Sequence, residues 1–444
     1  MLKQKINDTT AVIGILGLGH VGYPMSSLFA KNGFTTVGYD INPTRLKDIQ
    51  SGKVVSELDG ILPVNKKKRQ EKLAEIEKNL NLTNEEENLK NADVFLIDVP
   101  TPLKENETPN LVFLENTCKT ICTFLKKGTL VIVESTIYPG ATQEIVKPLL
   151  EESGLCAGTD FYLSFSPERI DPGNKKWGLE KIPKIVGGIN KQSVDLASSL
   201  FSKIVETVIP VSSLEVAEST KMLENLFRSV NIALINDLSK FFEKMGIDTW
   251  ETIAAASSKP FGFLPHYPGP GVGGHCIPKD PFYLLYKANK SGTNLEFVEE
   301  AAAINKNMPL YVIHLIEKTL KLCNKTLRDS SFAVLGVTYK RDVLDIRRTP
   351  SKTVVTELCK ISKNLMIFDP LTDETFGAKT STLDETIKGK DCIVLMVDHS
   401  YFRENNLEEK INELSPNCCV VDTRNFIDSK KLKKSIHYKC LGKP

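Results

Sequence analysis

Cys276 stands in a loop whose neighbours favour a reactive thiol. The surrounding sequence is GVGGHCIPKD, so two glycines precede the cysteine, and His275, Lys279 and Asp280 flank it. Glycines let a ligand approach the backbone closely, and a nearby cation raises the fraction of thiolate, the reactive form of cysteine. These residues alone indicate either a nucleophile or an incidental loop thiol. The cysteines and histidines lack the spacing of a zinc site, so we expect no metal.

Residues 17–22, GLGHVG, have the spacing of a loop that holds a dinucleotide. An apolar run precedes them and a helical stretch follows. Gly17 would make the tight turn, Gly19 would let a pyrophosphate approach the backbone, and Gly22 would let the helix pack on the strand. Asp40 ends the next strand, where a carboxylate accepts hydrogen bonds from the ribose hydroxyls and repels a 2′-phosphate. The pattern predicts NAD rather than NADP; the alternative is a glycine-rich turn in an unrelated α/β protein.

Lys221, Asn225 and Arg228 are spaced four and three residues apart in a helical stretch, so they share one face of that helix. Further asparagines, Asn231 and Asn236, recur where the sequence is otherwise apolar enough for a core helix. Polar groups in such a helix need partners, and a ligand is one such partner. The alternative is an ordinary solvated face.

The elements around these residues alternate in type, which predicts a parallel α/β sheet with helices on both faces. We expect strands at 12–16, 35–39, 92–99, 129–134, 161–165, 184–186 and 206–210. A helix of about 30 residues follows at 214–245, and a second helical stretch at 295–323 is expected to break near Pro309. Between them, the Gly/Pro-rich segment 259–284 should have no regular structure. Strands then resume at 331–336, 364–369, 392–397 and 418–422.

Composition restricts the class of protein. The chain has 444 residues, with 57 Lys+Arg against 55 Asp+Glu, so no global charge favours nucleic acid or an anionic membrane as a partner. We find no apolar run of about 18 residues and no signal-peptide pattern. Ten cysteines without regular spacing are typical of reduced thiols. We expect a cytoplasmic protein of several domains. The charged segment 53–91 contains KKKR followed by compensating acids, which favours a solvated helix.

The chain resembles the UDP-glucose/GDP-mannose dehydrogenase family over nearly its whole length. The resemblance rests on these motifs, in this order: GLGHVG, DVPTPL, ESTIYPGAT, FSPERIDPGN, STKMLENLFRSVNIALINDL, KPFGFLPHYPGPGVGGHCIPKDP and GVTYKRDVLDIRRTPS. It implies an NAD-binding Rossmann domain at 1–211, a central helical dimerisation region with the cysteine loop at 212–325, and a Rossmann-like UDP-sugar-binding domain at 326–444. It also implies a homodimer or higher homo-oligomer.

The resemblance implies a four-electron oxidation of a nucleotide-sugar C6 hydroxyl to a carboxylate with two NAD+. Cys276 matches the family nucleophile, which forms a thiohemiacetal that is oxidised to a thioester. Lys221 and Asn225 match the pair that stabilises the developing oxyanion, and Lys221 also matches a residue that handles protons.

Other site residues are carried over from the same resemblance. Thr136 and Asp280 match residues that place or activate water for thioester hydrolysis, and Glu168 matches an active-site glutamate that contacts substrate and acts in acid–base steps. The implied cofactor contacts are Gly17, Gly19, His20, Val21, Gly22, Asp40, Arg45, Thr101, Thr136 and Arg347. The implied substrate contacts are Glu168, Arg169, Lys221, Asn225, Arg228, Gly273 and Lys340.

The identity of the sugar is predicted from departures within the family. UDP-glucose enzymes carry a glutamate where this chain has Pro172, and UDP-N-acetylmannosamine enzymes carry a His-x-Arg pair where it has Pro260 and Gly262. SPERIDPGN with KPFGFLPHYPGPG is similar to UDP-N-acetylglucosamine 6-dehydrogenases, so UDP-N-acetylglucosamine is the expected substrate. UDP-glucose and UDP-N-acetylmannosamine are the alternatives. A single-step β-hydroxyacid dehydrogenase is more remote, because it needs neither Cys276 nor a second α/β domain.

Overall fold

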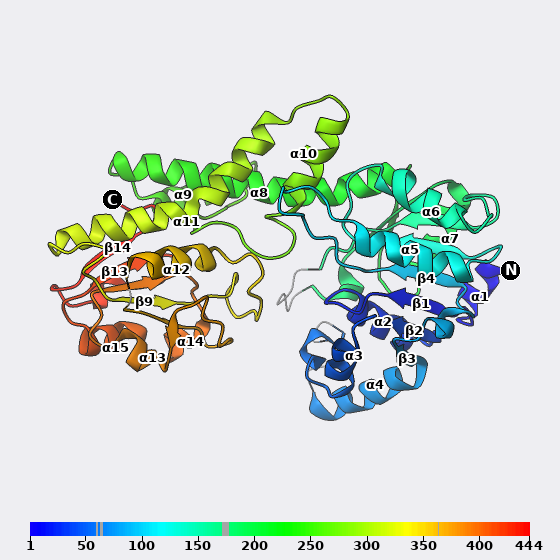
Figure 1. The fold of residues 1–444 in the computed structure, drawn as a ribbon, viewed down its shortest axis with the longest axis horizontal. Helices are drawn as coiled ribbons and strands as arrows, with labels where there is room; N and C mark the ends of the chain where they lie inside the picture. Colours follow the sequence, from blue (N-terminus) through cyan, green and yellow to red (C-terminus); the bar gives the residue numbers. More distant parts are fainter. Residues whose placement is uncertain (59–60, 63–64, 171–176, 363) are drawn as a thin grey trace. The chain divides into compact units, whose positions relative to one another are not determined.

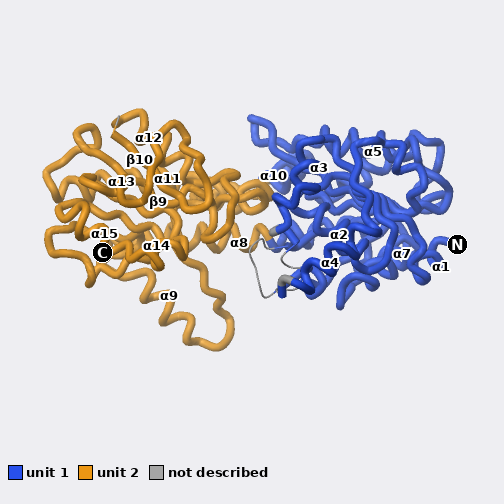
Figure 2. The backbone as a smooth tube through the Cα atoms, turned by 90° about the horizontal axis from the view of Figure 1, so that it is seen from below, with its two compact units in different colours: residues 1–224, 282–293 blue, residues 225–281, 294–444 orange. Residues whose placement is uncertain are grey.

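The computed structural model of the chain describes residues 1–58, 61–62, 65–170, 177–362 and 364–444 (Figure 1). The chain divides into two compact units, which are described separately (Figure 2). The first consists of residues 1–224 and 282–293, and the second of residues 225–281 and 294–444. Each unit contains one largely parallel sheet covered by helices, which confirms the expected α/β class.

The sheet of the first unit has eight strands in the order β3-β2-β1-β4-β5-β6-β7-β8. They are β1 (Ile13–Leu16), β2 (Thr36–Tyr39), β3 (Leu80–Thr83), β4 (Val94–Ile97), β5 (Leu130–Val133), β6 (Tyr162–Phe165), β7 (Lys184–Gly188) and β8 (Val208–Pro210). The order around β1 is that of a dinucleotide-binding sheet. The expectation of an all-parallel sheet is wrong at one place, because β7 runs antiparallel to β6.

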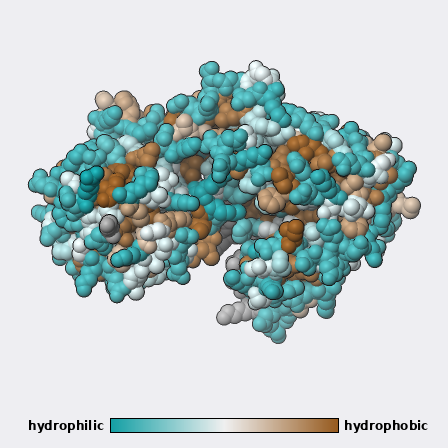
Figure 3. Space-filling model, in the orientation of Figure 1, coloured by the Kyte–Doolittle hydropathy of each residue, from teal (hydrophilic) through white to brown (hydrophobic). Residues whose placement is uncertain are grey.

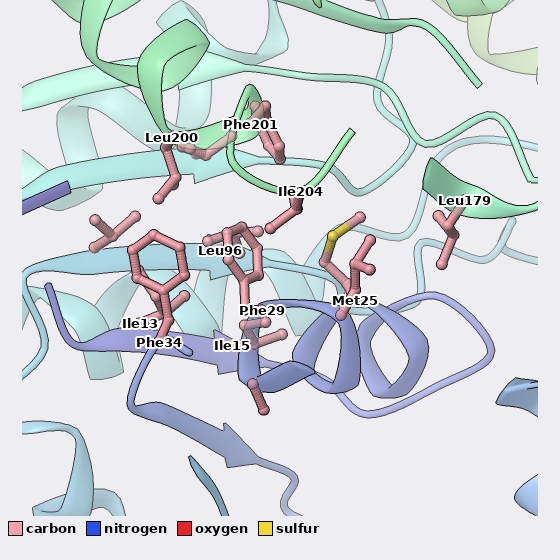
Figure 4. Packing of buried hydrophobic residues seen from close by; sticks show 14 of the residues in the cluster. Ile13, Ile15, Met25, Phe29, Phe34, Leu96, Leu179, Leu200, Phe201 and Ile204 are labelled. Carbon is pink, nitrogen blue, oxygen red and sulfur yellow. The ribbon is translucent and has the colours of Figure 1, made fainter. Parts of the chain in front are cut away.

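Helices cover both faces of this sheet. On one face, α2 (Gly22–Lys31) and α7 (Lys191–Phe201) bury apolar side chains against β1 and β4 (Figure 4). The rings of Phe29 and Phe34 meet there edge to face, with centroids 5.8 Å apart. On the other face lie α5 (Val112–Phe124) and α6 (Lys147–Glu151). The first unit also contains α1 (Leu2–Asn7), α3 (Pro43–Gln50) and α4 (Lys66–Asn79); α4 confirms the helix expected at KKKR.

The second unit repeats this plan with a six-stranded parallel sheet in the order β11-β10-β9-β12-β13-β14. The strands are β9 (Phe332–Leu335), β10 (Leu365–Phe368), β11 (Lys379–Thr380), β12 (Cys392–Leu395), β13 (Cys419–Asp422) and β14 (His437–Cys440). One face packs on α11 (Glu296–Leu322) and α12 (Pro350–Ile361). The other face packs on α13 (Leu383–Ile387) and α15 (Leu407–Leu414), near α14 (Ser400–Glu404).

The long helices correct two expectations. The helix α11 runs unbroken through Pro309, which is itself buried. Its neighbours Met308 and Val312 pack against the second sheet, and this packing outweighs one lost backbone hydrogen bond. The Gly/Pro-rich segment also ends earlier than expected, since α10 (Asp280–Lys290) begins inside it. An acidic residue and a proline suit the first turn of a helix. Two further helices are α8 (Leu214–Lys244), which was expected, and α9 (Thr249–Ser257), which was not predicted.

On the face seen in Figure 3, hydrophilic side chains cover most of the surface, with separate apolar patches between them. Among the helices of the described residues, we find none with both the length and the apolar character that a bilayer span requires.

Candidate active site

The three glycines of residues 17–22 have different tasks in the structure. A side chain on Gly17, whose φ is +97°, would meet the backbone oxygen of Asp98 at 2.6 Å, and one on Gly22 would meet the oxygen of Gly17 at 1.8 Å. Both glycines are therefore required by the tight strand-to-helix turn. At Gly19 a side chain would meet no atom of the described chain within 4 Å. This open position before the N-terminus of α2 fits a dinucleotide pyrophosphate.

Asp40 follows β2 and is directed to the same loop. Its carboxylate accepts hydrogen bonds from the backbone N–H of Leu18 at 2.8 Å and of Asn42 at 2.9 Å. Each oxygen retains a lone pair for a further donor. Asp40 therefore holds the glycine loop, and its expected contact with a ribose hydroxyl stays a prediction.

Arg45 and His20 share a partner that the sequence did not indicate. The Arg45 guanidinium donates to both carboxylate oxygens of Glu57, at 3.1 and 2.6 Å, and His20 Nδ1 lies 3.1 Å from Glu57 Oε1. Burial raises the pKa of Glu57, but hydrogen bonds from His20 and Arg45 outweigh it and lower that pKa below its ordinary value. Glu57 belongs to the charged segment 53–91. Its charge offsets Arg45, which leaves less positive charge for a 2′-phosphate.

Thr101 and Thr136 meet at the carboxyl ends of β4 and β5. Thr101 Oγ1 donates to the backbone oxygen of Thr136 at 2.7 Å, and Tyr283 of α10 donates to the backbone oxygen of Thr101 at 2.8 Å. Both threonines are buried. In folds of this class, ligands bind at the end of the parallel sheet where the strands have their carboxyl ends.

Glu218 supports the segment that follows Thr136. Its carboxyl group is fully buried on α8 and accepts hydrogen bonds from Gly140 N at 2.5 Å, Thr142 N at 2.9 Å and Thr142 Oγ1 at 2.6 Å. Burial raises the pKa of Glu218 to about 7, although these three hydrogen bonds act in the opposite direction.

This pKa predicts a pH-dependent contribution to stability. Because the folded state binds the Glu218 proton more tightly than the unfolded state, the contribution is fully present below about pH 4.5 and is lost as the pH rises to about 7. The shift corresponds to about 3 kcal/mol. Urea unfolding of the wild type and of Glu218→Gln from pH 5 to 8 should therefore show the variant gaining stability relative to the wild type as the pH rises. Curves that stay parallel would contradict this, and the exposed Glu299→Gln serves as control.

Glu168 and Arg169 follow β6 and are held by neighbours within the first unit. Glu168 Oε1 accepts the Arg169 backbone N–H at 2.7 Å, and Oε2 accepts Lys184 Nζ at 2.7 Å. The Arg169 guanidinium donates to both oxygens of Glu224, at 3.0 and 2.5 Å, and to the Pro183 oxygen at 2.8 Å. The expected contacts of Glu168 and Arg169 with substrate stay predictions.

In the second unit, the cysteine loop closes a tight turn at the start of α10. The backbone oxygen of Cys276 accepts the N–H groups of Lys279 and Asp280, each at 2.9 Å. Asn225 Nδ2 donates to Asp280 Oδ2 at 2.6 Å, so two residues 55 positions apart meet beside this turn. Lys279 and Asp280 are each 1% exposed, whereas Cys276 is partly exposed. His275 Nδ1 lies 3.9 Å from the Cys276 sulfur.

The glycines before Cys276 allow a second loop to approach. A side chain on Gly273 would meet Tyr339 Cβ at 2.6 Å, and Gly274, with φ +89°, would meet the Tyr339 ring at 2.9 Å. The Gly274 N–H donates to the Arg347 backbone oxygen at 2.9 Å. The missing side chains of these glycines leave room for Tyr339, and the expected contact of Gly273 with substrate stays a prediction. The same loop carries Lys340, whose backbone oxygen accepts Thr338 Oγ1 at 3.3 Å.

The backbone of Arg347 contacts the cysteine loop, and its side chain is paired with a nearby acid. Its guanidinium donates to both oxygens of Asp345, and this pairing raises the pKa of Arg347. Arg347 was expected to contact NAD, and that contact stays a prediction.

The predicted site residues fall in both units. The first unit holds the glycine loop, Asp40, Thr136, Glu168 and Lys221, which is 7% exposed on α8. The second holds Asn225, Arg228, Gly273, Cys276, Asp280, Lys340 and Arg347. Arg228 is exposed on α8.

Three family models match the chain. Residues 11–205 match the NAD binding domain of the UDP-glucose/GDP-mannose dehydrogenase family, residues 215–307 its central domain and residues 333–429 its UDP binding domain. A UDP-N-acetyl-D-mannosamine dehydrogenase of Methanococcus maripaludis strain C7 is 36% identical over 95% of each chain. A UDP-N-acetyl-D-glucosamine 6-dehydrogenase of Salmonella typhi is 36% identical over 89% of this chain and 92% of its own. The solved structure of a UDP-D-ManNAc dehydrogenase from Pyrococcus horikoshii, 32% identical, superimposes with a TM-score of 0.87, covering 97% of this chain and 99% of that one.

Proposed function

Because the chain belongs to the UDP-glucose/GDP-mannose dehydrogenase family and is an NAD-dependent nucleotide-sugar dehydrogenase, we propose that it oxidises the C6 hydroxyl of a UDP-N-acetylhexosamine to a carboxylate. The observation that carries this proposal is the turn at Cys276, with Asn225 hydrogen-bonded to Asp280 beside it. A single-step dehydrogenase has no use for a thiol held in this way. When bound, NAD+ would supply the hydride acceptor for each of the two oxidations, and the glycine loop at 17–22 and Asp40 would hold it.

The residues then divide the work. The Cys276 thiolate attacks the aldehyde carbon; a C–S bond forms, and the carbonyl oxygen becomes an alkoxide. Lys221 and Asn225 stabilise that negative oxygen by charge and by an amide N–H. After the second oxidation, water held by Thr136 and Asp280 attacks the thioester, the C–S bond breaks and Cys276 leaves as thiolate. In total, one alcohol, two NAD+ and one water give one carboxylate, two NADH and three protons.

Two sugars are in question. We rank UDP-N-acetylglucosamine first, because the chain has Pro260 and Gly262 where the mannosamine enzymes carry a His-x-Arg pair. Pro172, which stands where the glucose enzymes have a glutamate, lies outside the described residues. UDP-N-acetylmannosamine is the second candidate, favoured by the relatives of that name in Methanococcus maripaludis and Pyrococcus horikoshii.

The test is the absorbance of NADH with NAD+ and limiting UDP-N-acetylglucosamine, UDP-N-acetylmannosamine, UDP-glucose or UDP-galactose in parallel. We expect two NADH per sugar nucleotide, fastest with the N-acetylglucosamine donor. Two NADH with another donor would retain the mechanism and refute the sugar assignment. One NADH per donor, or none, would refute the thioester route.

The proposed domain organisation has three parts, divided after residues 211 and 325: an NAD-binding domain, a central helical region and a UDP-sugar-binding domain.

The proposed assembly is a homodimer. On α8, the apolar side chains of Phe227, Leu234 and Phe241 recur every seven residues and are 47%, 52% and 55% exposed. A continuous apolar stripe on a helix favours burial against another helix. We assign the partner as a second copy of this chain, and light scattering of the purified protein tests it by mass.

Asp40→Ala should raise the KM for NAD by about tenfold or more while leaving the affinity for the UDP-sugar nearly unchanged. The substitution removes an ionised acceptor, and a hydrogen bond to a charged group contributes about 1.5–3 kcal/mol. Initial rates give the KM, and calorimetry gives the UDP-sugar affinity. Asp48→Ala, which removes a carboxylate paired with Lys53 outside the glycine loop, is the matched control. An unchanged KM for NAD would remove Asp40 from the cofactor site.

A further inference from the structure

Four ionisable side chains are buried together at one end of the first sheet. Asp98, Glu134 and Glu168 follow β4, β5 and β6, and Lys184 begins β7; their residues are 9%, 1%, 7% and 4% exposed. Because β4, β5 and β6 are parallel neighbours, the three acids lie at the same end of the sheet. Lys184 lies at that end because β7 runs antiparallel to β6. Phe165 pairs with Gly187, and extending this register by three residues places Glu168 opposite Lys184.

The ammonium of Lys184 joins two of these acids. Its Nζ lies 2.7 Å from Glu168 Oε2 and 2.5 Å from Glu134 Oε1, with the Phe201 ring centroid 5.1 Å away. A buried charge is tolerated only when it is paired and hydrogen-bonded. Glu168 Oε1 is occupied by the Arg169 backbone N–H at 2.7 Å, so both oxygens of Glu168 are held in place. The orientation of this carboxylate therefore depends on Lys184.

The charge balance shows how the cluster is maintained. Three carboxylates and one ammonium would leave two uncompensated negative charges in a buried site. Burial, followed by the charge of Glu134, raises the pKa of Asp98 well above its ordinary value, which favours the neutral form and reduces this excess of negative charge. Burial alone would lower the pKa of Lys184, but attraction to Glu134 and Glu168 outweighs it and raises that pKa. Lys184 is therefore charged and remains between its two acids.

We infer that Lys184 is a positioning residue: anchored by Glu134, its ammonium fixes the Glu168 carboxylate in the orientation in which it meets the sugar nucleotide. The inference rests on the proposed function, which assigns Glu168 to substrate. It adds Lys184 and Glu134, which act through Glu168, to the residues on which turnover depends.

The experiment is a double-mutant cycle in kcat. Lys184→Met should lower kcat at least tenfold with the KM for NAD changed less than twofold, and Lys184→Arg should restore part of the loss. Because Lys184 acts through Glu168, adding Lys184→Met to Glu168→Gln should lower kcat no further. Lys191→Met, which removes an exposed lysine paired with Asp195, is the matched control. Losses that multiply in the double variant would overturn the inference.

Two additions keep the test decisive. If Lys184→Met does not fold, Glu134→Gln replaces it; its loss in kcat should likewise vanish in the Glu168→Gln background. If the wild type forms no NADH with any UDP-sugar, the proposed function fails. The urea-unfolding midpoints of the same variants then test separately whether Lys184 holds Glu168. Midpoint shifts that are not additive between Lys184→Met and Glu168→Gln would support the pair, and additive shifts would overturn it.

Discussion

Cys276→Ser should stop formation of the sugar acid while leaving both ligands bound. A serine hydroxyl is not ionised near neutral pH, so it cannot trap the aldehyde as the thiolate does. We expect the rate of acid formation to fall by at least about a thousandfold, as for loss of other enzymatic nucleophiles. NADH stoichiometry and chromatography of the sugar nucleotide measure the result.

The stoichiometry separates this explanation from simple damage. A variant that still carries out the first oxidation yields one NADH per sugar nucleotide and releases or retains the aldehyde. Calorimetry should give wild-type affinities for NAD and for the UDP-sugar. Cys156→Ser, at the exposed cysteine, is the matched control and should behave like the wild type. Acid production at the wild-type rate by Cys276→Ser would refute the thioester route.

Lys221→Ala should lower kcat by about two orders of magnitude or more. Lys221 is 7% exposed on α8, and a cation in such surroundings interacts with a developing oxyanion more strongly than it would in water. Both oxidations pass through a negatively charged oxygen, so the loss applies to each. Initial rates at saturating NAD+ and UDP-sugar measure it.

The control for this substitution lies on the same helix. Lys240→Ala shortens another lysine of α8, one that pairs with Asp237 three residues earlier, and should leave kcat within twofold of the wild type. A tenfold loss or less in Lys221→Ala would make Lys221 a binding residue rather than an oxyanion stabiliser. A rise in KM without any change in kcat would give the same conclusion.

The sequence by itself determined those features that depend on neighbours along the chain. The loop at 17–22 was predictable because strand, glycines and helix follow each other directly, and Asp40 because it ends the next strand. The helix α8 was predictable over its full length, since apolar spacing continues without Gly or Pro. The proposed roles of Cys276, Lys221 and Asn225 came instead from the family resemblance.

Only the tertiary structure decided which distant residues meet. Nothing local to Lys184 indicates that β7 reverses and brings its ammonium to Glu168, and nothing local to Gly273 shows that Tyr339 occupies its Cβ position. Pro309 predicts a break in any isolated helix, yet α11 continues because one face is buried against the second sheet. The physical reason is common to all of these. Local pattern sets the element, whereas burial and pairing between elements far apart in the chain set which side chains share a site.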